Sequence, residues 1–314
     1  MKPFQKILYL AGSTPADAEA WACVVERAAS WGATLTLLEV TQPLTVYDAW
    51  LELPISARDL EARVREQRDA SLRALQEHAA RHGVASEVIH TRGKPHIEVI
   101  RAVIRGGYDL VAKQADTTKP GLFTRGAELA LQRKCPCPVW LLKPTPQTRH
   151  ARVVAAVDLQ PDDAEQTALN RKIVEMAVLM AEFDKFELDV VNTWELPGEA
   201  AMRTLADIPE ATIEKFARDV EQLRYRWMNE FLEPFRQRYS PCAGRVVRGA
   251  PEEVLLKLDS SEPVGLLVMG TQARTGIPGF LIGNTAEFVL GHVDCAVMTV
   301  KPDGFVSPVL STNR

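Results

Sequence analysis

The sequence predicts an α/β protein made of two tandem domains, each a mainly parallel five-stranded sheet flanked by helices. Its length allows this, because 314 residues suffice for two domains of about 150 residues, each with its own core. The order of motifs in the first half recurs in the second half. Within each half, short apolar runs alternate with helical segments, as in a parallel sheet that is covered on both faces.

The duplication is visible in paired motifs that keep their spacing. Arg92-Gly-Lys-Pro recurs 156 residues later as Arg248-Gly-Ala-Pro, and Gly126-Ala-Glu recurs 157 residues later as Gly283-Asn-Thr-Ala-Glu. The two offsets differ by a single residue, so the register is kept between the copies. A short Pro-rich segment between the copies is expected to be a linker. The expected domain limits are residues 1–146 and 150–303, followed by a tail at residues 304–314.

In the first copy, apolar runs mark the strands and helical periodicity marks the helices. Continuous apolar runs predict strands that are buried on both faces, and Gly32 separates the first helix from the second run. The long helix that follows is amphipathic and rich in charges, which indicates one solvated face. The expected elements are strand Lys6–Ala11, helix Asp17–Ala29, strand Thr34–Val40, helix Leu60–Arg81, a helix after Arg92, strand Tyr108–Ala112 and strand Cys137–Lys143.

The second copy shows the same succession of elements. The segment Trp194–Asp207, rich in Pro, Gly, Glu and Ala, is expected to form a loop or lid over the sheet edge. The long helix after it carries an apolar stripe that favours core packing; this stripe comprises Phe216, Val220, Leu223, Trp227, Phe231 and Phe235. The expected elements are strand Val153–Val157, helix Thr167–Ala181, strand Leu188–Val191, helix Ile213–Arg238, strand Gly265–Met269 and strand Cys295–Lys301.

Composition and charge exclude several classes of protein. A net charge of −4 and a pI near 5.9 are unlike the basic footprint of a nucleic-acid-binding domain. No apolar run approaches the roughly 20 residues that span a bilayer, and the first residues do not read as a signal peptide. Five scattered cysteines suit a reducing compartment, and Cys135-Pro-Cys137 is interpreted as a pair of small buried side chains. We therefore expect a soluble cytoplasmic protein.

Binding chemistry is expected in the segment after Met269. Glycines at positions 270, 276, 279 and 283 let backbone amides face a ligand, and Asn284 with Glu287 is close to a helix-capping box. A glycine-rich turn from a parallel strand into a helix N-terminus favours a phosphate, and Arg274 could add a cation. An ordinary strand-to-helix connection also needs glycines and a cap, so composition leaves both interpretations open. Neither the Walker A motif nor Gly-x-Gly-x-x-Gly occurs here.

This segment resembles the signature of the universal stress proteins. The matching stretch reads Val-Met-Gly270-Thr-Gln-Ala-Arg-Thr-Gly, then Gly283-Asn-Thr-Ala-Glu, then His-Val-Asp-Cys-Ala-Val. Nucleotide-binding members of that family carry Gly-x2-Gly-x9-Gly-Ser/Thr at this place. Gly270 and Gly283 match the first and third glycines of the motif. Ala273 stands in place of the second glycine, and Asn284 in place of the Ser/Thr.

The resemblance implies an adenine-nucleotide site in the second domain, with ATP as the ligand, with or without Mg²⁺. Asp158, after the first strand of that copy, matches the family's Asp that contacts the nucleoside, although a helix cap or an Asx turn would explain it equally well. By the same matching, Thr193 would lie against the adenine. The residues that the resemblance assigns to the nucleotide are Asp158, Thr193, Met269, Gly270, Ala273, Arg274, Gly283, Asn284 and Thr285.

The first copy departs further from the family's motif. It carries Gly12 in place of the Asp, Lys113 in place of the first glycine and Asp116 in place of the second. Asp116 would put a carboxylate where the phosphate should lie, and like charges repel unless they are screened or paired, here by Lys113. We therefore expect no ATP binding of the family's kind in the first copy.

These observations favour a stress-response protein that binds a small ligand and acts as a sensor or regulator. The alternative is a scaffold that has lost nucleotide binding, or a binder of another small or apolar ligand. The six histidines lack metal-ligand spacing, and no catalytic motif is recognised, so at most slow ATP hydrolysis is expected. The resemblance also implies that the two domains pack as an internal pseudo-dimer. A protein partner and a further homodimer through the long helices are left open.

Overall fold

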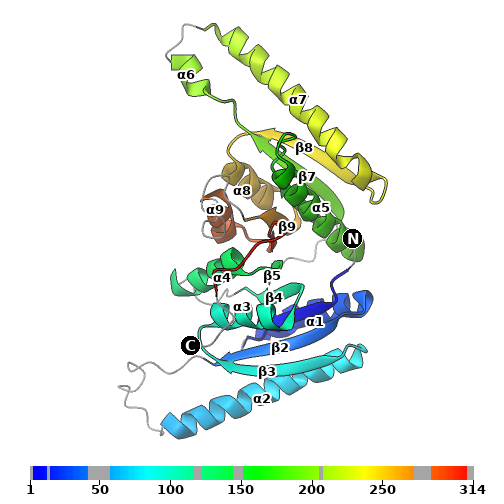
Figure 1. Cartoon of the computed structure of the whole chain (residues 1–314), viewed down its shortest axis with the longest axis vertical. Helices are drawn as coiled ribbons and strands as arrows, with labels where there is room; N and C mark the ends of the chain where they lie inside the picture. The colour runs from blue at the N-terminus through cyan, green and yellow to red at the C-terminus, as the bar shows by residue number, and fades with distance from the viewer. Residues whose placement is uncertain are drawn as a thin grey trace. The chain divides into compact units, whose positions relative to one another are not determined.

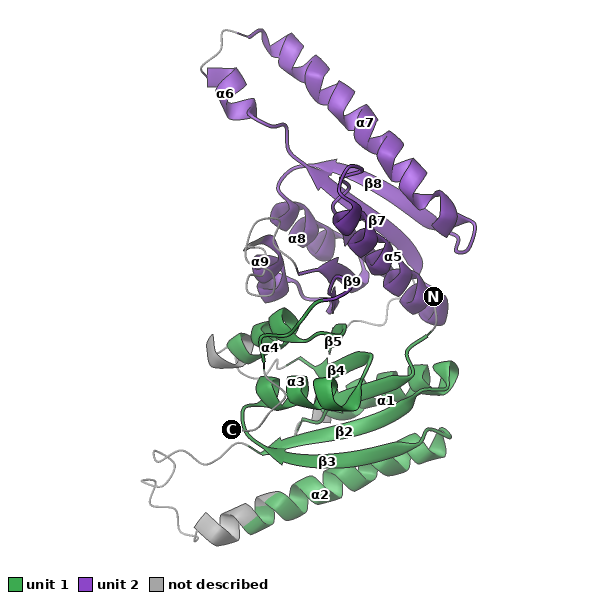
Figure 2. Ribbon diagram, viewed as in Figure 1, with its two compact units in different colours: residues 1–144, 276–281, 305–314 green, residues 145–275, 282–304 purple. Residues whose placement is uncertain are grey.

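The computed structural model of the chain describes residues 3–12, 15–41, 57–115, 122–143, 151–204, 208–271 and 284–309. These residues form two units, coloured separately in Figure 2: within the described ranges, unit 1 spans residues 3–143 and 305–309, and unit 2 spans residues 151–271 and 284–304. Each unit contains a parallel sheet with helices packed on it, so the expected fold of two tandem α/β domains is confirmed. Their packing as an internal pseudo-dimer stays a prediction.

Unit 1 alternates strands and helices. Its elements are β1 (Lys6–Leu10), α1 (Pro15–Trp31), β2 (Thr34–Thr41), α2 (Ala57–Arg81), β3 (Ser86–Arg92), α3 (Pro95–Gly106), β4 (Leu110–Gln114), α4 (Leu122–Lys134) and β5 (Val139–Leu142). Across the sheet the strands take the order β3-β2-β1-β4-β5, and neighbouring strands are parallel. The long helix α2 runs along β3 (Figure 1).

The main core cluster of unit 1 joins the centre of its sheet to α3 and α4. Val99 and Ile100 of α3 and Leu131 of α4 are buried together with Leu8 of β1. Complete burial of an aliphatic side chain of this size contributes about 1.5–3 kcal/mol. Val309, near the end of the described chain, packs against the same cluster, so the segment 305–309 takes part in the core of unit 1.

Unit 2 repeats this plan, and its described residues include a short helix before the long one. Its elements are β6 (Arg152–Val157), α5 (Ala164–Asp184), β7 (Glu187–Trp194), α6 (Glu199–Thr204), α7 (Glu210–Arg236), β8 (Cys242–Arg248), α8 (Pro251–Ser261), β9 (Val264–Gly270), α9 (Asn284–His292) and β10 (Ala296–Val300). The strands take the order β8-β7-β6-β9-β10, again with parallel neighbours. The chain thus proceeds from β6 to β8 in one direction and then crosses to β9 on the other side of β6.

The buried face of α7 differs from the one that the sequence predicts. The helix buries Ile213, Ala217, Met228, Leu232 and Phe235. Of the predicted stripe only Phe235 belongs to that set, whereas Phe216 is 48 % exposed and Leu223 is 36 % exposed, so the predicted core packing of the stripe is wrong. The reason lies in β8, where a Cβ on Gly244 would lie 2.6 Å from Cγ of Met228. The missing side chain lets α7 approach the sheet with Met228 and its neighbours inward.

Two further differences concern polar segments. The sequence predicts a loop or lid at residues 194–207, but the structure places α6 there, and Arg203 of α6 forms ion pairs with Glu210 and Glu214 of α7. β3 and β8 are not among the strands that the apolar runs predict. Each ends the strand order of its unit. No residue of β3 and only one residue of β8 is fully buried, so neither forms a continuous apolar run.

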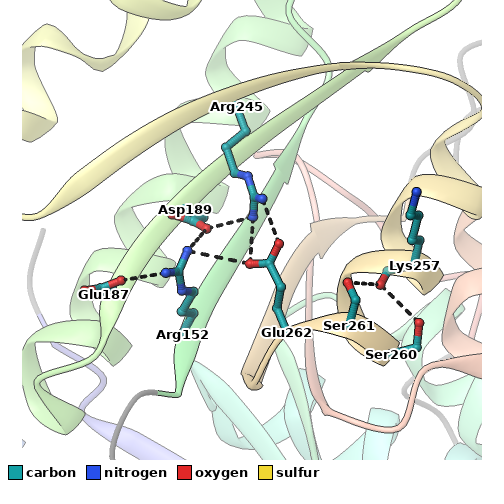
Figure 3. Close-up of polar contacts among 8 residues, drawn as sticks. All are labelled: Arg152, Glu187, Asp189, Arg245, Lys257, Ser260, Ser261 and Glu262. Atoms are coloured by element: carbon teal, nitrogen blue, oxygen red, sulfur yellow. Dashed lines mark hydrogen bonds and ion pairs between the residues drawn. The ribbon is translucent and has the colours of Figure 1, made fainter.

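An ion-pair cluster ties the amino-terminal ends of β6, β7 and β8 to the residue after α8 (Figure 3). The buried carboxylate of Asp189 accepts hydrogen bonds from Nη1 of Arg152 at 2.9 Å and from Nη1 of Arg245 at 3.0 Å. Arg245 also pairs with Glu262 at 2.7 Å, which raises the pKa of the guanidinium and lowers the pKa of the carboxyl. The cluster borders a cavity of about 470 Å³. Because these charges are paired with one another, we interpret this end of the sheet as structural.

Replacing Gly244 with alanine tests the close approach of α7 to β8. Gly244→Ala should lower the free energy of unfolding by about 1–3 kcal/mol, because the new methyl group overpacks the contact with Met228. The matched control is Gly291→Ala in α9, where a Cβ would meet nothing within 4 Å and should stabilise the helix by about 0.5–1 kcal/mol. Urea unfolding followed by circular dichroism measures both changes. Equal stability of the two variants would contradict the packing argument.

Candidate functional site

The candidate site of unit 2 lies at the carboxyl ends of its strands. The strand order reverses between β6 and β9, and in parallel α/β sheets ligands bind outside the carboxyl ends at such a reversal. Asp158 follows β6, Thr193 stands near the end of β7, and Gly270 ends β9. The strand registers place these ends side by side. The structure therefore brings Asp158, Thr193, Met269 and Gly270 to one edge of the sheet.

Asp158 is held in place by Asn170 of α5, a residue that sequence reasoning missed. Asn170 is 1 % exposed; its Nδ2 donates to the Asp158 carbonyl at 2.7 Å, and its Oδ1 accepts from the Asp158 N–H at 3.1 Å. The Asp158 carboxylate accepts from Nε2 of Gln160 at 3.1 Å. The cap of α5 is Asp163, whose carboxylate accepts from the Gln166 N–H at 2.9 Å. Capping of this helix therefore does not require Asp158.

A cluster of arginine and tryptophan side chains borders the end of β7. Trp194 is 4 % exposed, and the guanidinium carbons of Arg224 and Arg248 lie 5.9 and 5.7 Å from the centre of its ring, within the range of cation–π attraction. Arg224 also approaches Oδ1 of the buried Asn192, whose Nδ2 donates to the last carbonyl of β6 at 3.2 Å. Because side chains alternate along a strand, Thr193 faces the other side of the sheet from Asn192 and Trp194.

A buried cation stands at the ends of β9 and β10. Lys301 is 4 % exposed, and its ammonium donates to the hydroxyl of Thr271, which is 2 % exposed. Gly270 also has a packing role, because a Cβ there would lie 3.1 Å from Cδ2 of Leu169 in α5. Sequence reasoning did not single out Lys301. The available signal was that both copies follow their last strand with a lysine, which is Lys143 in the first copy.

The middle of the glycine-rich segment lies outside the described residues. Ala273, Arg274 and Gly283 belong to that part of the chain, so their roles stay predictions. Asn284 begins α9, which agrees with the helix start expected there. Thr285, in the first turn of α9, donates its hydroxyl to Oε2 of Glu252 at 3.2 Å.

In unit 1 the matching sheet edge is occupied by the unit's own side chains. Asp17 of α1 is 4 % exposed, and its carboxylate accepts from the Gly12 N–H at 3.0 Å and from the Tyr9 hydroxyl at 2.7 Å. Burial raises the pKa of Asp17, although these two hydrogen bonds and the nearby Lys113 lower it. A carboxylate is thus buried beneath position 12, where unit 2 carries Asp158 at the edge.

The sequence matches Lys113 to Gly270, but the strand registers align it with Met269. Lys113 is also engaged within unit 1. Its ammonium donates to Oε1 of Glu128 at 2.5 Å. Glu128 lies in α4, so the ion pair joins the end of β4 to the helix that follows it. Asp116, the partner for Lys113 suggested by the sequence, lies outside the described residues.

Within the described part of the chain, no group of three or more His, Cys, Asp or Glu side chains could hold a metal ion. The sulfur atoms of Cys135 and Cys137 are 3.6 Å apart, and their hydrogen bond, together with burial, raises the pKa of the Cys137 thiol. A protonated thiol is a weak nucleophile and metal ligand, which agrees with the interpretation of this pair as small buried side chains. Among the described helices, none is long and apolar enough to cross a membrane.

Comparison with known proteins extends the likeness to nearly the whole chain. The model of the universal stress protein family matches residues 3–143 and 150–301. Universal stress protein E of Escherichia coli (strain K12) is 29 % identical over 278 residues, and the one of Photorhabdus laumondii is 27 % identical over 279; these cover 85 % of this chain and 85 % and 86 % of the relatives. The crystal structure of a universal stress protein from Archaeoglobus fulgidus aligns with a TM-score of 0.65 and 14 % identity, over 96 % of this chain and 98 % of that one. At that identity the structural match shows the shared fold.

The burial of Asp17 predicts a specific pH dependence for the variant Asp17→Asn. The folded-state pKa of Asp17 lies above its unfolded value, so its contribution to stability is fully present below the unfolded pKa and is lost as pH rises through the folded pKa. Asparagine does not titrate. The stability of Asp17→Asn relative to the parent should therefore improve as pH rises across that window. Urea unfolding of both proteins over a pH series checks this, and a difference that is constant with pH would refute it.

Proposed function

The chain belongs to the universal stress protein family, and from this premise we propose that unit 2 binds an adenine nucleotide, ATP, and that the protein acts as a sensor or regulator in the stress response. Members of the family are generally not enzymes, so the proposal is reversible binding rather than turnover. A cytoplasmic location is part of the same proposal.

One observation carries the proposal: the two units end their first strands differently. In unit 2 the backbone of Asp158 is satisfied by the neutral amide of Asn170, and the Asp158 carboxylate remains half-buried at the sheet edge. In unit 1 the buried carboxylate of Asp17 accepts from the Gly12 N–H, and an ion pair joins Lys113 of β4 to Glu128 of α4. This difference supports a nucleotide site in unit 2 rather than in unit 1.

The proposed contacts follow from the chemistry of each group. The Asp158 carboxylate only accepts hydrogen bonds and suits the ribose hydroxyls, while Thr193 lies against the adenine. The amides of the loop from Gly270 to Gly283 and the N-terminus of α9 suit the phosphates, because unpaired N–H groups and the helix dipole favour an anion. The buried ammonium of Lys301 adds positive charge beside the start of that loop.

The two departures from the family's motif are mild in this proposal. Ala273 adds one methyl group where the motif has glycine. Asn284 replaces Ser or Thr, and these residue types are similarly good helix N-caps. The chain keeps the spacing of the motif, and we give that spacing more weight than the two substitutions. Mg²⁺ would accompany the phosphates, so binding is to be measured with and without it.

A second candidate is a different small or apolar ligand beneath residues 194–207, or a scaffold role without a ligand. The observation that favours it is the Trp194 cluster, which offers an aromatic face and two guanidinium groups at the same sheet edge. Mass spectrometry of small molecules that co-purify with the full chain separates the candidates. A nucleotide would support the first one, and another molecule would support the second.

Calorimetry of the full chain with ATP should show one site per chain. Asp158→Ala should weaken binding at least tenfold, because a hydrogen bond to a charged group contributes about 1.5–3 kcal/mol. The matched control is Asp162→Ala, the same change at an exposed residue of the same loop, which should bind ATP like the parent. Two sites per chain, or equal losses in both variants, would sink the assignment.

Two substitutions in the predicted phosphate loop should have opposite effects. Gly283→Asp should remove most of the ATP affinity, since it adds bulk and a negative charge beside the phosphates. Asn284→Ser should retain or improve affinity, because serine is an equally good N-cap and supplies the family's hydroxyl. Titration with ATP gives the affinities, and thermal unfolding verifies that both variants are folded. If Gly283→Asp binds ATP like the parent, the loop does not hold the phosphates.

A further inference from the structure

The exposed apolar side chains of unit 2 gather on α7. Among the described side chains, eight large apolar residues are exposed, and three of them, Phe216, Leu223 and Tyr225, lie on α7. The matching long helix α2 has none among its described side chains. We define the α7 stripe as Phe216, Val220, Leu223 and Trp227; the first and third are exposed, and the other two are half-buried.

The packing of unit 2 leaves the α7 stripe on one flank of the helix. The sheet-facing side of α7 is a different set of residues, which includes Ala217, Met228 and Leu232. The flank opposite the stripe is tied to β8, where the Tyr225 hydroxyl and the Arg236 guanidinium reach backbone carbonyls at 3.5 and 3.4 Å. Figure 1 shows α7 running along β8. The stripe thus remains partly uncovered although its residues are among the largest of the helix.

The spacing of the stripe and its neighbouring charges match a two-helix seam. Stripe residues recur at intervals of four, three and four positions, and such a pattern lets two helices interlock side chains along a line. Asp219 and Arg226 each stand one residue before a half-buried stripe residue, and both are exposed. Among the described residues neither has an ion-pair partner. Charges at these positions select the partner helix and its orientation.

We propose that the α7 stripe binds the α7 stripe of a second copy of this chain, with the two helices antiparallel. In this register Val220 packs against Leu223 of the second copy, and Phe216 packs against Trp227 of the second copy. The two-fold axis of the dimer forms each of these two contacts twice, with the copies exchanged. A single self-complementary interface therefore covers the stripes of both copies. The inference goes beyond the proposed nucleotide site and does not depend on it.

Charge complementarity identifies a second copy as the occupant. When the apolar layers are aligned in this way, Asp219 lies across the seam from Arg226 of the second copy, offset by two residues along the helix, and the two-fold axis forms this pair twice. Lys215 and Glu230, which are exposed and of opposite charge, are related by the same offset. A small apolar ligand could cover the stripe, but it would give no reason for opposite charges at positions that this two-fold axis relates.

Sedimentation velocity of the full chain over a concentration series tests the proposal. The parent should show a reversible monomer–dimer equilibrium. Asp219→Arg and Arg226→Asp each bring like charges together twice, and each should raise the dimer Kd about tenfold, given the size of exposed ion pairs. The double variant Asp219→Arg/Arg226→Asp restores opposite charges and should return the Kd to that of the parent.

Two control variants distinguish a change in the α7–α7 contact from a general effect on charge or folding. Arg218→Asp makes the same charge change at an exposed position of α7 off the stripe, and should leave the Kd unchanged. Leu223→Gln removes an apolar layer and should weaken the dimer while the thermal midpoint stays near that of the parent. A chain that is monomeric at every concentration overturns the proposal. A dimer that ignores the single charge changes, or one that the double variant fails to restore, overturns it as well.

Discussion

A parallel strand that ends beneath packed helices leaves backbone groups that must find partners, and this constraint shapes both halves of the molecule. Unit 2 meets it with Asn170, an amide that donates to and accepts from the backbone of Asp158. Unit 1 meets it with Asp17, whose carboxylate accepts from Gly12 and Tyr9. A buried amide with both partners stays neutral, whereas a buried carboxylate places negative charge beneath the edge and has its pKa raised. The choice of residue therefore sets whether a neutral or an ionisable group lies beneath each sheet edge.

The strands of the core could be predicted because parallel sheets bury them on both faces. β1, β6 and β9 are short, largely apolar runs that lie between helical segments of the sequence. The same reasoning does not predict β3 and β8, since each ends the strand order of its unit and leaves nearly all of its residues exposed or only partly buried. The helix face of α7 could not be predicted from residue size alone. It depends on Gly244, which lies in a different element and becomes a neighbour of Met228 only in the folded chain.

The same distinction between local and distant sequence information applies to the candidate site. Asp158, Thr193 and Gly270 could be placed together because each stands at the carboxyl end of a strand, and parallel strands end at a common edge. Asn170 and Lys301 could not, since a polar residue within a helix or after a strand shows nothing of its partner in the sequence. The Lys113–Glu128 ion pair could not be predicted either, because it joins residues from two elements of unit 1. Sequence thus predicts where a site lies better than it predicts what orients the groups within it.

The two copies also diverged in how their long helices meet the sheet. In β8 the absence of a side chain at Gly244 lets Met228 and Leu232 of α7 pack inward, which leaves Phe216 and Leu223 on the flank of the helix. At the matching position of β3 unit 1 carries Val88, and α2 exposes charged residues instead of large apolar ones among its described side chains. A single backbone position can therefore turn a core-facing helix stripe into a surface. After a duplication, each copy retains its fold through its own core, so one copy is free to change its helix surface and the other its strand-end charge.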